Sequence, residues 1–278
     1  MPLISGHTRL IAHIGYPTHS FKAPLIYNPF FERENIDCVV VPLGCQAADF
    51  AQVLRAVFRL TNICGALITM PHKLSVVGML DEASPAVSIS GACNAVRRTD
   101  DGRLVGDLFD GEGFVRGVRR KGVRVEGARV LVVGAGGVGS AIAASFAAAG
   151  AGAIGLFDVN AETARGLSDR LRAHFPHLEV CTGSNDPAGW GIVVNATPMG
   201  MAPGDPLPLD VSRLAPTTFV GEVVMRTTMT AFLEAARARG CRFQVGTDML
   251  FEQIPAYLEY FGLPSTTAED LREVARLE

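Results

Sequence analysis

The chain has 278 residues, of which 48% are hydrophobic and 19% are charged, and its formal net charge is −3. This length supports a large buried core and favours two domains over one, at about 100–200 residues each. The weak negative charge gives no indication of binding to nucleic acid or to an anionic membrane. Neither a secretory signal layout nor a confident membrane span is found, so we expect a cytoplasmic protein without such partners.

The cysteines and histidines show none of the spacings typical of metal sites. Six of each are present, without a CxxC pair or an HExxH motif. With no export signal, the cysteines are interpreted as reduced core thiols, and no metal site is expected. Ordinary core or surface roles are assigned to His7, His13, His174 and His177.

Short apolar runs alternate with helical patterns along most of the chain, which favours parallel sheets covered by helices. The strands predicted in the first third lie near residues 10–14, 38–42, 65–69 and 92–97. Apolar residues recur at helical spacing over 49–60, so a helix is predicted there. In the second half, strands are predicted over 153–159, 191–195, 218–223 and 242–245, and amphipathic helices over 248–260 and 266–277.

Two segments of the first half are unusual. Pro71 follows a predicted strand, and a helix beginning there would hold Lys73 in its first turn. The helix dipole opposes a positive charge at that position, at a cost of about 0.3–1 kcal/mol, which suggests that the lysine has a function. Glycine and charged residues cluster over 106–122, and this segment is interpreted as a hinge.

A glycine-rich turn opens the second half, after five apolar residues and before an alanine-rich helix. Its residues match the GxGxxG pattern of dinucleotide-binding domains and are Gly134, Ala135, Gly136, Gly137, Val138 and Gly139. Gly134 permits the tight turn, Gly136 lets the backbone approach a pyrophosphate, and Gly139 allows close packing of helix on strand. The N–H groups of the following helix N-terminus would face the phosphates.

Asp158 ends the next predicted strand, 19 residues after Gly139. A carboxylate at this position accepts hydrogen bonds from the ribose hydroxyls of NAD and would repel the additional phosphate of NADP. No arginine occupies Val159 or Asn160 to receive that phosphate, and Arg165 lies further along. We therefore expect NAD as the cofactor, with NADP less favoured.

Polar motifs at the predicted strand ends together resemble the shikimate dehydrogenase family, and the resemblance covers nearly the whole chain. The matching stretches are Gly15–Ser20 (GYPTHS), Thr69–Lys73 (TMPHK), Gly91–Asn94 (GACN), Asp110–Gly111, Asn195–Met201 (NATPMGM) and Gly246–Gln253 (GTDMLFEQ). Six motifs in the right order are far more specific than any one of them.

The resemblance implies reversible hydride transfer between a nicotinamide and a ring hydroxyl of a small alicyclic hydroxy acid, such as shikimate or quinate. It implies that Lys73 and Asp110 form the proton-transfer pair. The residues that would hold the acid are Ser20, Lys22, Thr69, Asn94 and Gln253. Besides the glycine turn and Asp158, the residues that would contact the cofactor are Asn195, Thr197 and Gly246.

We accordingly expect an α/β protein of two domains, either a monomer or a homodimer. Residues 1–111 would form the substrate-binding and catalytic domain, and residues 112–246 a Rossmann-type, doubly wound NAD-binding domain. The C-terminal helices, 247–278, would return to pack on the substrate domain.

Three departures from the family pattern concern the substrate. Lys22 stands where a second serine is usual, and Leu108-Phe109 replaces an Asn-Thr pair. The run Glu222–Thr227 lacks the tyrosine of the family's Asp-x-Val-Tyr-x-Pro stretch. A site that loses hydrogen-bonding partners discriminates steeply between substrates, so we expect the acid recognised to be altered or broadened.

Two other functions remain open. A methylene-tetrahydrofolate dehydrogenase has a similar two-domain plan and also uses a lysine, although the segments around Ser20, Asn94 and Gln253 favour the shikimate type. A non-catalytic, NAD-binding sensor of the same fold is the alternative outside enzymes. The presence of both Lys73 and Asp110 disfavours it.

Overall fold

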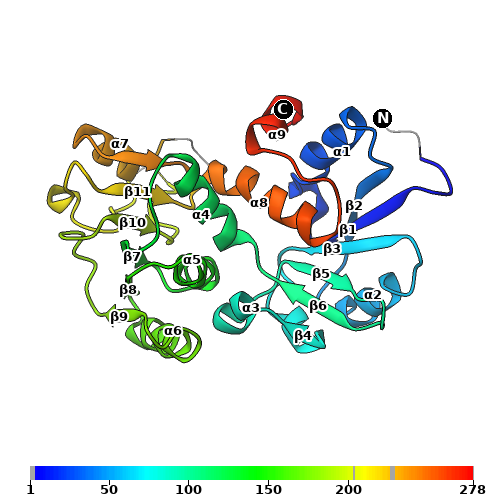
Figure 1. Cartoon of the computed structure of the whole chain (residues 1–278), viewed down its shortest axis with the longest axis horizontal. Coiled ribbons are helices and arrows are strands. Elements are labelled where there is room, and N and C mark those ends of the chain that lie inside the picture. Colours follow the sequence, from blue (N-terminus) through cyan, green and yellow to red (C-terminus); the bar gives the residue numbers. More distant parts are fainter. Residues whose placement is uncertain (1–3, 203, 226–228, 278) are drawn as a thin grey trace. The chain divides into compact units, whose positions relative to one another are not determined.

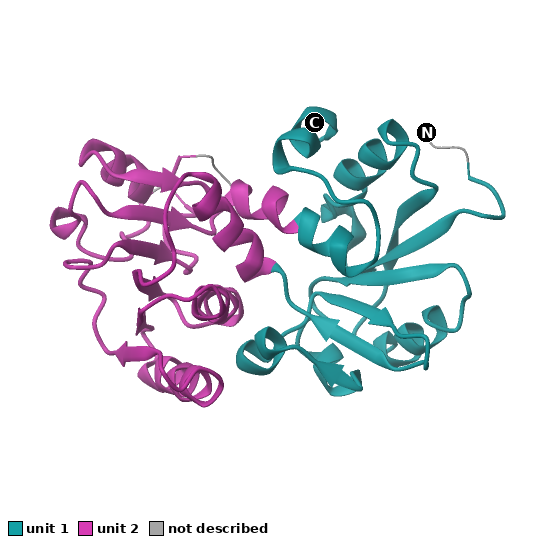
Figure 2. Cartoon of the chain, viewed as in Figure 1, with its two compact units in different colours: residues 1–109, 254–278 teal, residues 110–253 magenta. Residues whose placement is uncertain are grey.

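The computed structural model describes residues 4–202, 204–225 and 229–277 and divides the chain into two compact units (Figures 1 and 2). Unit 1 contains residues 1–109 and 254–278, and unit 2 contains residues 110–253. Each unit combines one sheet with helices, which confirms the predicted α/β class. The chain passes between the units after Phe109 and after Gln253, whereas the sequence prediction put these boundaries after residues 111 and 246.

The sheet of unit 1 has the strand order β2-β1-β3-β5-β6-β4 among the described residues. Its strands are β1 (Arg9–Gly15), β2 (Cys38–Gly44), β3 (Ile63–Ile68), β4 (Glu82–Ala83), β5 (Ala95–Arg98) and β6 (Leu104–Asp107). β1 pairs in parallel with β2 and β3, while β5 runs antiparallel to β3 and β6. The interior strand β1, between β2 and β3, is buried, since Ile11 and Ile14 are both fully inaccessible to solvent.

Helices flank this sheet in unit 1 (Figure 1). They are α1 (Pro24–Arg33), α2 (Phe50–Val57), α3 (Pro85–Ser90) and α9 (Ala268–Val274), with short 3₁₀ helices η1 (Thr18–Ser20) and η2 (Ser75–Met79). The helix predicted over 49–60 is therefore confirmed as α2.

The prediction that a helix begins at Pro71 is wrong. Residues 70–74 form turns that lead into η2, and the His72 N–H donates to the Thr69 carbonyl at 2.9 Å. This i→i+3 bond closes a tight turn rather than a turn of α-helix. Lys73 therefore lies outside any helical first turn, and the dipole cost assigned to it from the sequence does not apply.

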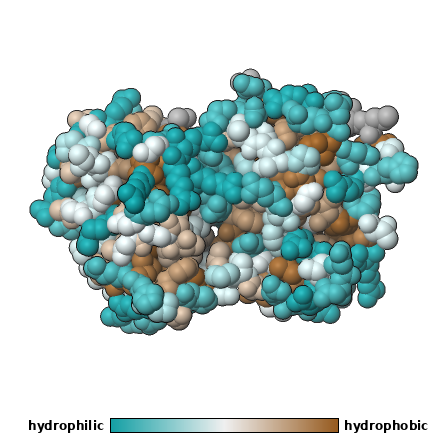
Figure 3. Space-filling view, viewed as in Figure 1, coloured by the Kyte–Doolittle hydropathy of each residue, from teal (hydrophilic) through white to brown (hydrophobic). Residues whose placement is uncertain are grey.

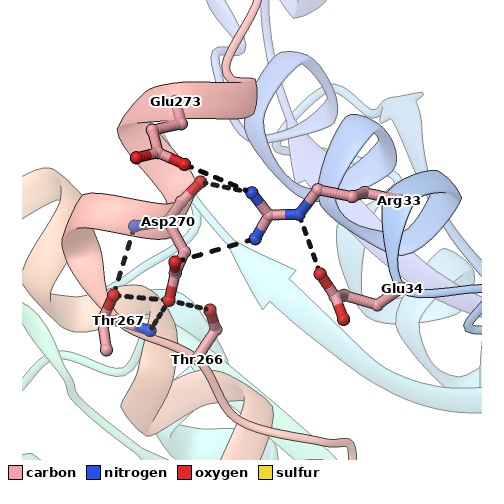
Figure 4. A network of polar contacts seen from close by, with 6 residues as sticks. All are labelled: Arg33, Glu34, Thr266, Thr267, Asp270 and Glu273. Carbon is pink, nitrogen blue, oxygen red and sulfur yellow. Dashed lines mark hydrogen bonds and ion pairs between the residues drawn. The ribbon is translucent and has the colours of Figure 1, made fainter.

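The C-terminal helix α9 packs on α1 within unit 1. Thr267 and Asp270 form a capping box that satisfies N–H groups at the start of α9. Arg33 of α1 reaches Glu273 at 3.7 Å and Asp270 at 4.0 Å (Figure 4). Such exposed ion pairs contribute little stability individually, whereas Leu271 of α9 is fully buried and adds apolar packing.

Unit 2 has a fully parallel sheet with the strand order β12-β11-β10-β7-β8-β9. Its strands are β7 (Arg129–Val133), β8 (Ala153–Phe157), β9 (Glu179–Thr182), β10 (Ile192–Asn195), β11 (Phe219–Glu222) and β12 (Arg242–Gln244). Read from β9, this is the 3-2-1-4-5-6 order of a doubly wound dinucleotide-binding fold. The structure thus confirms the Rossmann-type prediction.

The helices of unit 2 cover this sheet. They are α4 (Asp110–Arg120), α5 (Gly137–Ala148), α6 (Ala161–His174), α7 (Ala231–Ala238) and α8 (Gly246–Tyr260), with a 3₁₀ helix η3 (Val211–Arg213); α8 continues into unit 1. One core cluster joins β7, β10 and β11 to α7 and includes Leu131, Val193, Val220, Phe232 and Leu233.

The segment interpreted as a hinge is largely the helix α4. A Cβ on Gly111 would lie 2.1 Å from the Ala141 carbonyl oxygen of α5, and one on Gly117 would lie 2.4 Å from Gln244 Oε1. These glycines are therefore required because neighbouring backbones and side chains approach α4 closely. Glycine enrichment alone does not distinguish a flexible segment from a tightly packed one.

No described helix is long and apolar enough to cross a bilayer. The described residues also contain no group of three or more His, Cys, Asp or Glu side chains able to hold a metal ion. On the face drawn in Figure 3, both units expose hydrophobic patches among mainly hydrophilic residues.

Candidate functional site

The end of β3, the start of β5 and the end of β6 lie together in unit 1 and are joined by backbone hydrogen bonds. The Asn94 carbonyl accepts from the Ile68 N–H at 2.9 Å, and the Asn94 N–H donates to the Asp107 carbonyl at 3.0 Å. The Lys73 carbonyl accepts from the Cys93 N–H at 2.8 Å. The turn that carries Lys73 is thereby held next to Asn94.

The Asn94 side chain lies among these strand ends and is 1% exposed. Its Oδ1 accepts a hydrogen bond from the Phe109 N–H at 3.0 Å. Its Nδ2 is buried and has no hydrogen-bond partner among the residues that the structure describes. Buried amide donors are rarely left unpaired, so this group is suited to bind a ligand oxygen.

Lys73 and Asp110 lie at the two ends of this hydrogen-bonded path. Lys73 is half-buried, and Asp110, which directly follows Phe109, is 8% exposed. Asp110 is the first residue of α4, where backbone N–H groups and the helix dipole stabilise a carboxylate. The backbone at Lys73 and at Phe109, the last residue of this part of unit 1, is therefore tied to Asn94, and Asp110 begins unit 2.

Three of the residues expected to hold the acid follow β1 and β3. Ser20 is exposed, and its hydroxyl donates to the Pro17 carbonyl at 3.0 Å. Lys22 is exposed, while Thr69 is half-buried and its N–H donates to the Ile14 carbonyl at 3.0 Å. Ser20, Lys22 and Thr69 thus belong to loops at one end of the sheet of unit 1.

Gln253 lies on α8 and is 8% exposed. Its Oε1 is buried without a hydrogen-bond partner in the described part of the chain. The side chain passes close to α4, since a Cβ on Gly113 would lie 2.6 Å from Gln253 Cβ. This placement differs from the solvated helix face on which glutamine is common.

Phe109 forms an aromatic wall beside the site. Its ring makes edge contacts with Tyr257 and Tyr260, at centroid distances of 4.9 and 5.3 Å. The Tyr260 hydroxyl donates to the Val105 carbonyl at 2.7 Å, which fixes this tyrosine on the sheet. Together with the buried Leu108, Phe109 replaces polar side chains of the family pattern with apolar surface.

The glycine turn of unit 2 has the geometry that a dinucleotide requires. Gly134 has φ = +102°, and a Cβ on Gly139 would lie 1.9 Å from the Gly134 carbonyl oxygen. Gly136 and Gly137 are exposed, and a Cβ on either would meet no atom within 4 Å. The turn therefore offers open backbone before α5, whose N-terminal N–H groups can receive phosphate. Val138, in the first turn of α5, is half-buried.

Asp158 is held at the edge of this turn. Its Oδ2 accepts from the Ala135 N–H at 2.8 Å, and its Oδ1 accepts from the Asn160 N–H at 2.9 Å. The carboxylate is half-buried and immediately follows β8. This is the position from which a carboxylate reaches a ribose in dinucleotide-binding folds.

Asn195 and Thr197 shape the loop after β10 through bonds within that loop. Asn195 Oδ1 accepts from the N–H and hydroxyl of Thr197 at 3.1 and 2.6 Å, and Asn195 Nδ2 donates to the Met199 carbonyl at 3.1 Å. Ala196 packs against the glycine turn, where a Cβ on Gly134 would lie 2.7 Å from its carbonyl oxygen. The two side chains thus fix the loop beside the turn.

Gly246 has a packing role that the sequence did not reveal. A Cβ there would lie 2.0 Å from the Val224 carbonyl oxygen, so only glycine allows α8 to begin this close to the end of β11. Met225, which replaces the family's tyrosine, is half-buried. Arg226 and Thr227 of the same motif lie outside the described residues.

Glu222 is a buried acidic residue that the sequence did not indicate as a functional group. It is 0% exposed, ends β11 and pairs in register with Asn195. The Thr230 hydroxyl donates to its Oε2 at 2.9 Å. Burial raises the pKa of Glu222 to about 7, against the opposing effect of hydrogen bonds from Thr230 and Asn195. The sequence feature that could have indicated Glu222 is an acidic residue at the end of an otherwise apolar strand.

Comparisons with known proteins extend over nearly the whole chain. The family model described as the shikimate dehydrogenase substrate binding domain matches residues 13–96. The shikimate dehydrogenase (NADP(+)) of Acidiphilium cryptum is 35% identical over 263 residues, which cover 94% of this chain and 93% of that protein.

Two solved structures have the same fold over their full length. Shikimate 5-dehydrogenase from Listeria monocytogenes, in complex with shikimate and NAD, aligns with a TM-score of 0.90 at 26% identity and covers 99% of this chain and 98% of that one. Quinate dehydrogenase from Corynebacterium glutamicum, in complex with NAD, aligns with a TM-score of 0.83 at 29% identity, with coverages of 96% and 98%.

Proposed function

Because the chain belongs to the shikimate dehydrogenase family, we propose that it catalyses reversible hydride transfer at a ring hydroxyl of shikimate, quinate or a related alicyclic acid. The observation that carries this proposal is the hydrogen-bonded path from Lys73 through Asn94 to Phe109, the neighbour of Asp110. At the middle of this path lies an unpaired, buried amide donor, Asn94 Nδ2, that can bind a substrate oxygen.

Lys73 and Asp110 have different roles in the proposed proton transfer. The Lys73 ammonium donates a proton to the substrate's ketone oxygen during reduction and recovers it from the hydroxyl during oxidation. Asp110 compensates the positive charge of Lys73 and orients its amine. Asn94 Nδ2 donates to a neighbouring ring oxygen and fixes the ring relative to the amine.

The carboxylate of the substrate is held by donors from the loops after β1 and β3. Ser20 and Thr69 offer hydroxyl groups, and Lys22 offers a positive charge where the family has a second serine. Gln253 completes the set with a buried amide on α8. The apolar Leu108 and Phe109 remove hydrogen-bonding capacity elsewhere, so the preferred acid differs from that of a typical family member.

The residues of unit 2 fit a nicotinamide dinucleotide, which supplies or accepts the hydride when bound. The exposed backbone of Gly136 and Gly137 can approach a pyrophosphate, and the α5 N-terminus can bind it. The Asp158 carboxylate supports a preference for NAD, because it accepts ribose hydroxyls and repels a phosphate. The curated relative from A. cryptum is instead named for NADP(+), so cofactor choice requires a direct measurement.

An absorbance assay with NAD or NADP and each of shikimate and quinate tests the function. We expect turnover by the wild-type chain and a fall in kcat of about 100-fold or more in Lys73→Ala and Asp110→Asn. Lys121→Ala is the matched control, because this lysine lies beyond the end of α4 in a half-exposed pair with Asp248. Absence of turnover in wild type, or full activity of Lys73→Ala, would contradict the proposal.

A further inference from the structure

His13 is an anomalous residue in β1, an interior strand of the sheet of unit 1. It lies in β1, flanked by Ala12 and Ile14, and is 8% exposed. Its Nδ1 is buried and has no hydrogen-bond partner among the residues described. An unpaired polar group in a core costs free energy and requires an explanation, because an apolar residue would fill the same place in the strand.

The neighbours of His13 show on which face of the sheet its side chain lies. Side chains two residues apart in a strand lie on the same face, so His13 shares a face with Gly15. A Cβ on Gly15 would lie 2.4 Å from Thr69 Cγ2 and 3.0 Å from the Phe21 ring. The His13 ring itself stacks on Phe21, with centroids 4.1 Å apart and planes at 28°. His13 therefore lies directly beneath the loop that carries Ser20 and Lys22.

The charge of His13 is set by the same surroundings. Burial, followed by the positive charge of Lys73, lowers the pKa of His13 to about 4. The imidazole is therefore neutral at pH 7 and has one N–H donor and one acceptor nitrogen. With Nδ1 buried and unpaired, the other nitrogen, Nε2, is the one suited to donate.

His72 provides the contrast within the same unit. It precedes Lys73 in sequence and is fully buried, but its Nε2 lies 2.8 Å from the Cys45 carbonyl oxygen. Its ring stacks on Phe50 with centroids 4.0 Å apart. The Nε2 of His72 is thus paired within the protein, while its Nδ1, like that of His13, is buried without a partner among the described residues.

On the basis of the function proposed above, we propose that His13 contacts the substrate and determines specificity by donating a hydrogen bond from Nε2 to an oxygen at the carboxylate-bearing end of the acid. Stacking on Phe21, between Ser20 and Lys22, places the ring at that end of the site. The donor adds recognition where Phe109 and Leu108 have made the site more apolar. The substrates favoured are acids with an acceptor oxygen on or beside the carboxylate-bearing carbon.

Steady-state kinetics of the full chain with shikimate and with quinate test this assignment. We expect His13→Val to raise KM for at least one of these acids about tenfold or more, the loss of one hydrogen bond to a charged group, while kcat stays within about threefold. His13→Gln retains an N–H donor and should recover much of the lost affinity. His177→Val, at an exposed histidine of unit 2, is the control and should match wild type.

Thermal unfolding separates a binding role from a structural one. Valine removes an unpaired buried nitrogen from a β-strand, so the Tm of His13→Val should equal or exceed that of wild type. An unchanged KM for both acids would overturn the assignment of His13 while leaving the proposed function intact. A lowered Tm with parallel losses in both variants would also overturn it.

The same variants distinguish failure of the proposed function from failure of the role assigned to His13. If wild type turns over neither acid but is stabilised by one of them, the proposed function fails, and His13→Val must lose that stabilisation for the assignment to hold. If wild type shows neither turnover nor ligand-induced stabilisation, both proposals are wrong.

Discussion

The side-chain oxygen of Asn94 accepts a hydrogen bond from the backbone N–H of Phe109 at 3.0 Å. This bond ties the residue before β5 to the segment after β6, one position before Asp110. Because the Asn94 backbone also pairs with Ile68 and Asp107, the asparagine fixes three strand ends at once. Its unpaired Nδ2 is thereby held in a fixed direction for a ligand.

Asn94→Leu should lower both stability and activity. The substitution leaves the buried Phe109 N–H without an acceptor, at a cost of about 1–3 kcal/mol in the free energy of unfolding. It also removes the amide donor, so kcat/KM should fall about 100-fold. Urea unfolding and steady-state kinetics measure the two effects.

Asn28→Leu is the matched control for this prediction. Asn28 also bonds a strand backbone, with Nδ2 donating to the Val40 carbonyl at 3.1 Å and Oδ1 accepting from the Val40 N–H at 2.7 Å. It should lose similar stability with little change in kcat/KM. Equal kinetic losses in both variants would show that Asn94 acts only through folding.

Asp158→Asn should shift cofactor choice towards NADP. The variant removes the negative charge that disfavours the additional phosphate and weakens hydrogen bonding to the ribose. The ratio of kcat/KM for NAD to that for NADP should fall about tenfold or more. Asp169→Asn, at an exposed residue of α6, should leave the ratio unchanged. A wild-type chain that prefers NADP would contradict the role assigned to Asp158.

Glu222→Gln should remove a pH dependence of stability. The folded pKa of about 7 exceeds the value of 4.5 expected when unfolded, so the native state binds the proton more tightly. The contribution of Glu222 is therefore full below pH 4.5 and is lost as pH rises through 7, by about 2–3 kcal/mol. The variant should gain that amount over wild type between pH 4.5 and 8, measured by urea unfolding.

The difference between variant and wild type is the informative quantity here, because His13 has the opposite slope. Its folded pKa of about 4 lies below the 6.5 of the unfolded chain, so its contribution is lost as pH falls from 6.5 to 4. Glu179→Gln, at an exposed glutamate, should give a flat difference curve. A flat curve for Glu222→Gln as well would contradict the prediction.

Gly111→Ala should destabilise unit 2 despite the helical propensity of alanine. The added Cβ would lie 2.1 Å from the Ala141 carbonyl oxygen, so α4 and α5 must separate, at a cost of about 1–3 kcal/mol or more. Gly78→Ala is the control, because its Cβ would meet no atom within 4 Å. Chemical denaturation should show no loss in the control, and equal behaviour of the two variants would contradict this packing.

The sequence by itself determined the elements whose signals are local. The GAGGVG turn, the apolar strands around it and the alanine-rich helix specify a dinucleotide-binding unit, because each requirement concerns neighbouring residues. The order of polar motifs likewise indicated the family and placed Lys73 after β3, whereas Asn94, predicted to end a strand, directly precedes β5. Local chemistry was sufficient for these predictions.

Only the tertiary structure decided what depends on contacts between distant residues. The glycines of α4 indicated a hinge in the sequence, but in the structure Ala141 and Gln244 occupy the space beside them. Pro71 indicated a helix, but the bond from the His72 N–H to Thr69 closed a turn instead. Likewise, the environments of His13 and Glu222 are built by residues far away in the chain. Burial and pairing are properties of the packed fold, so no single stretch of sequence encodes them.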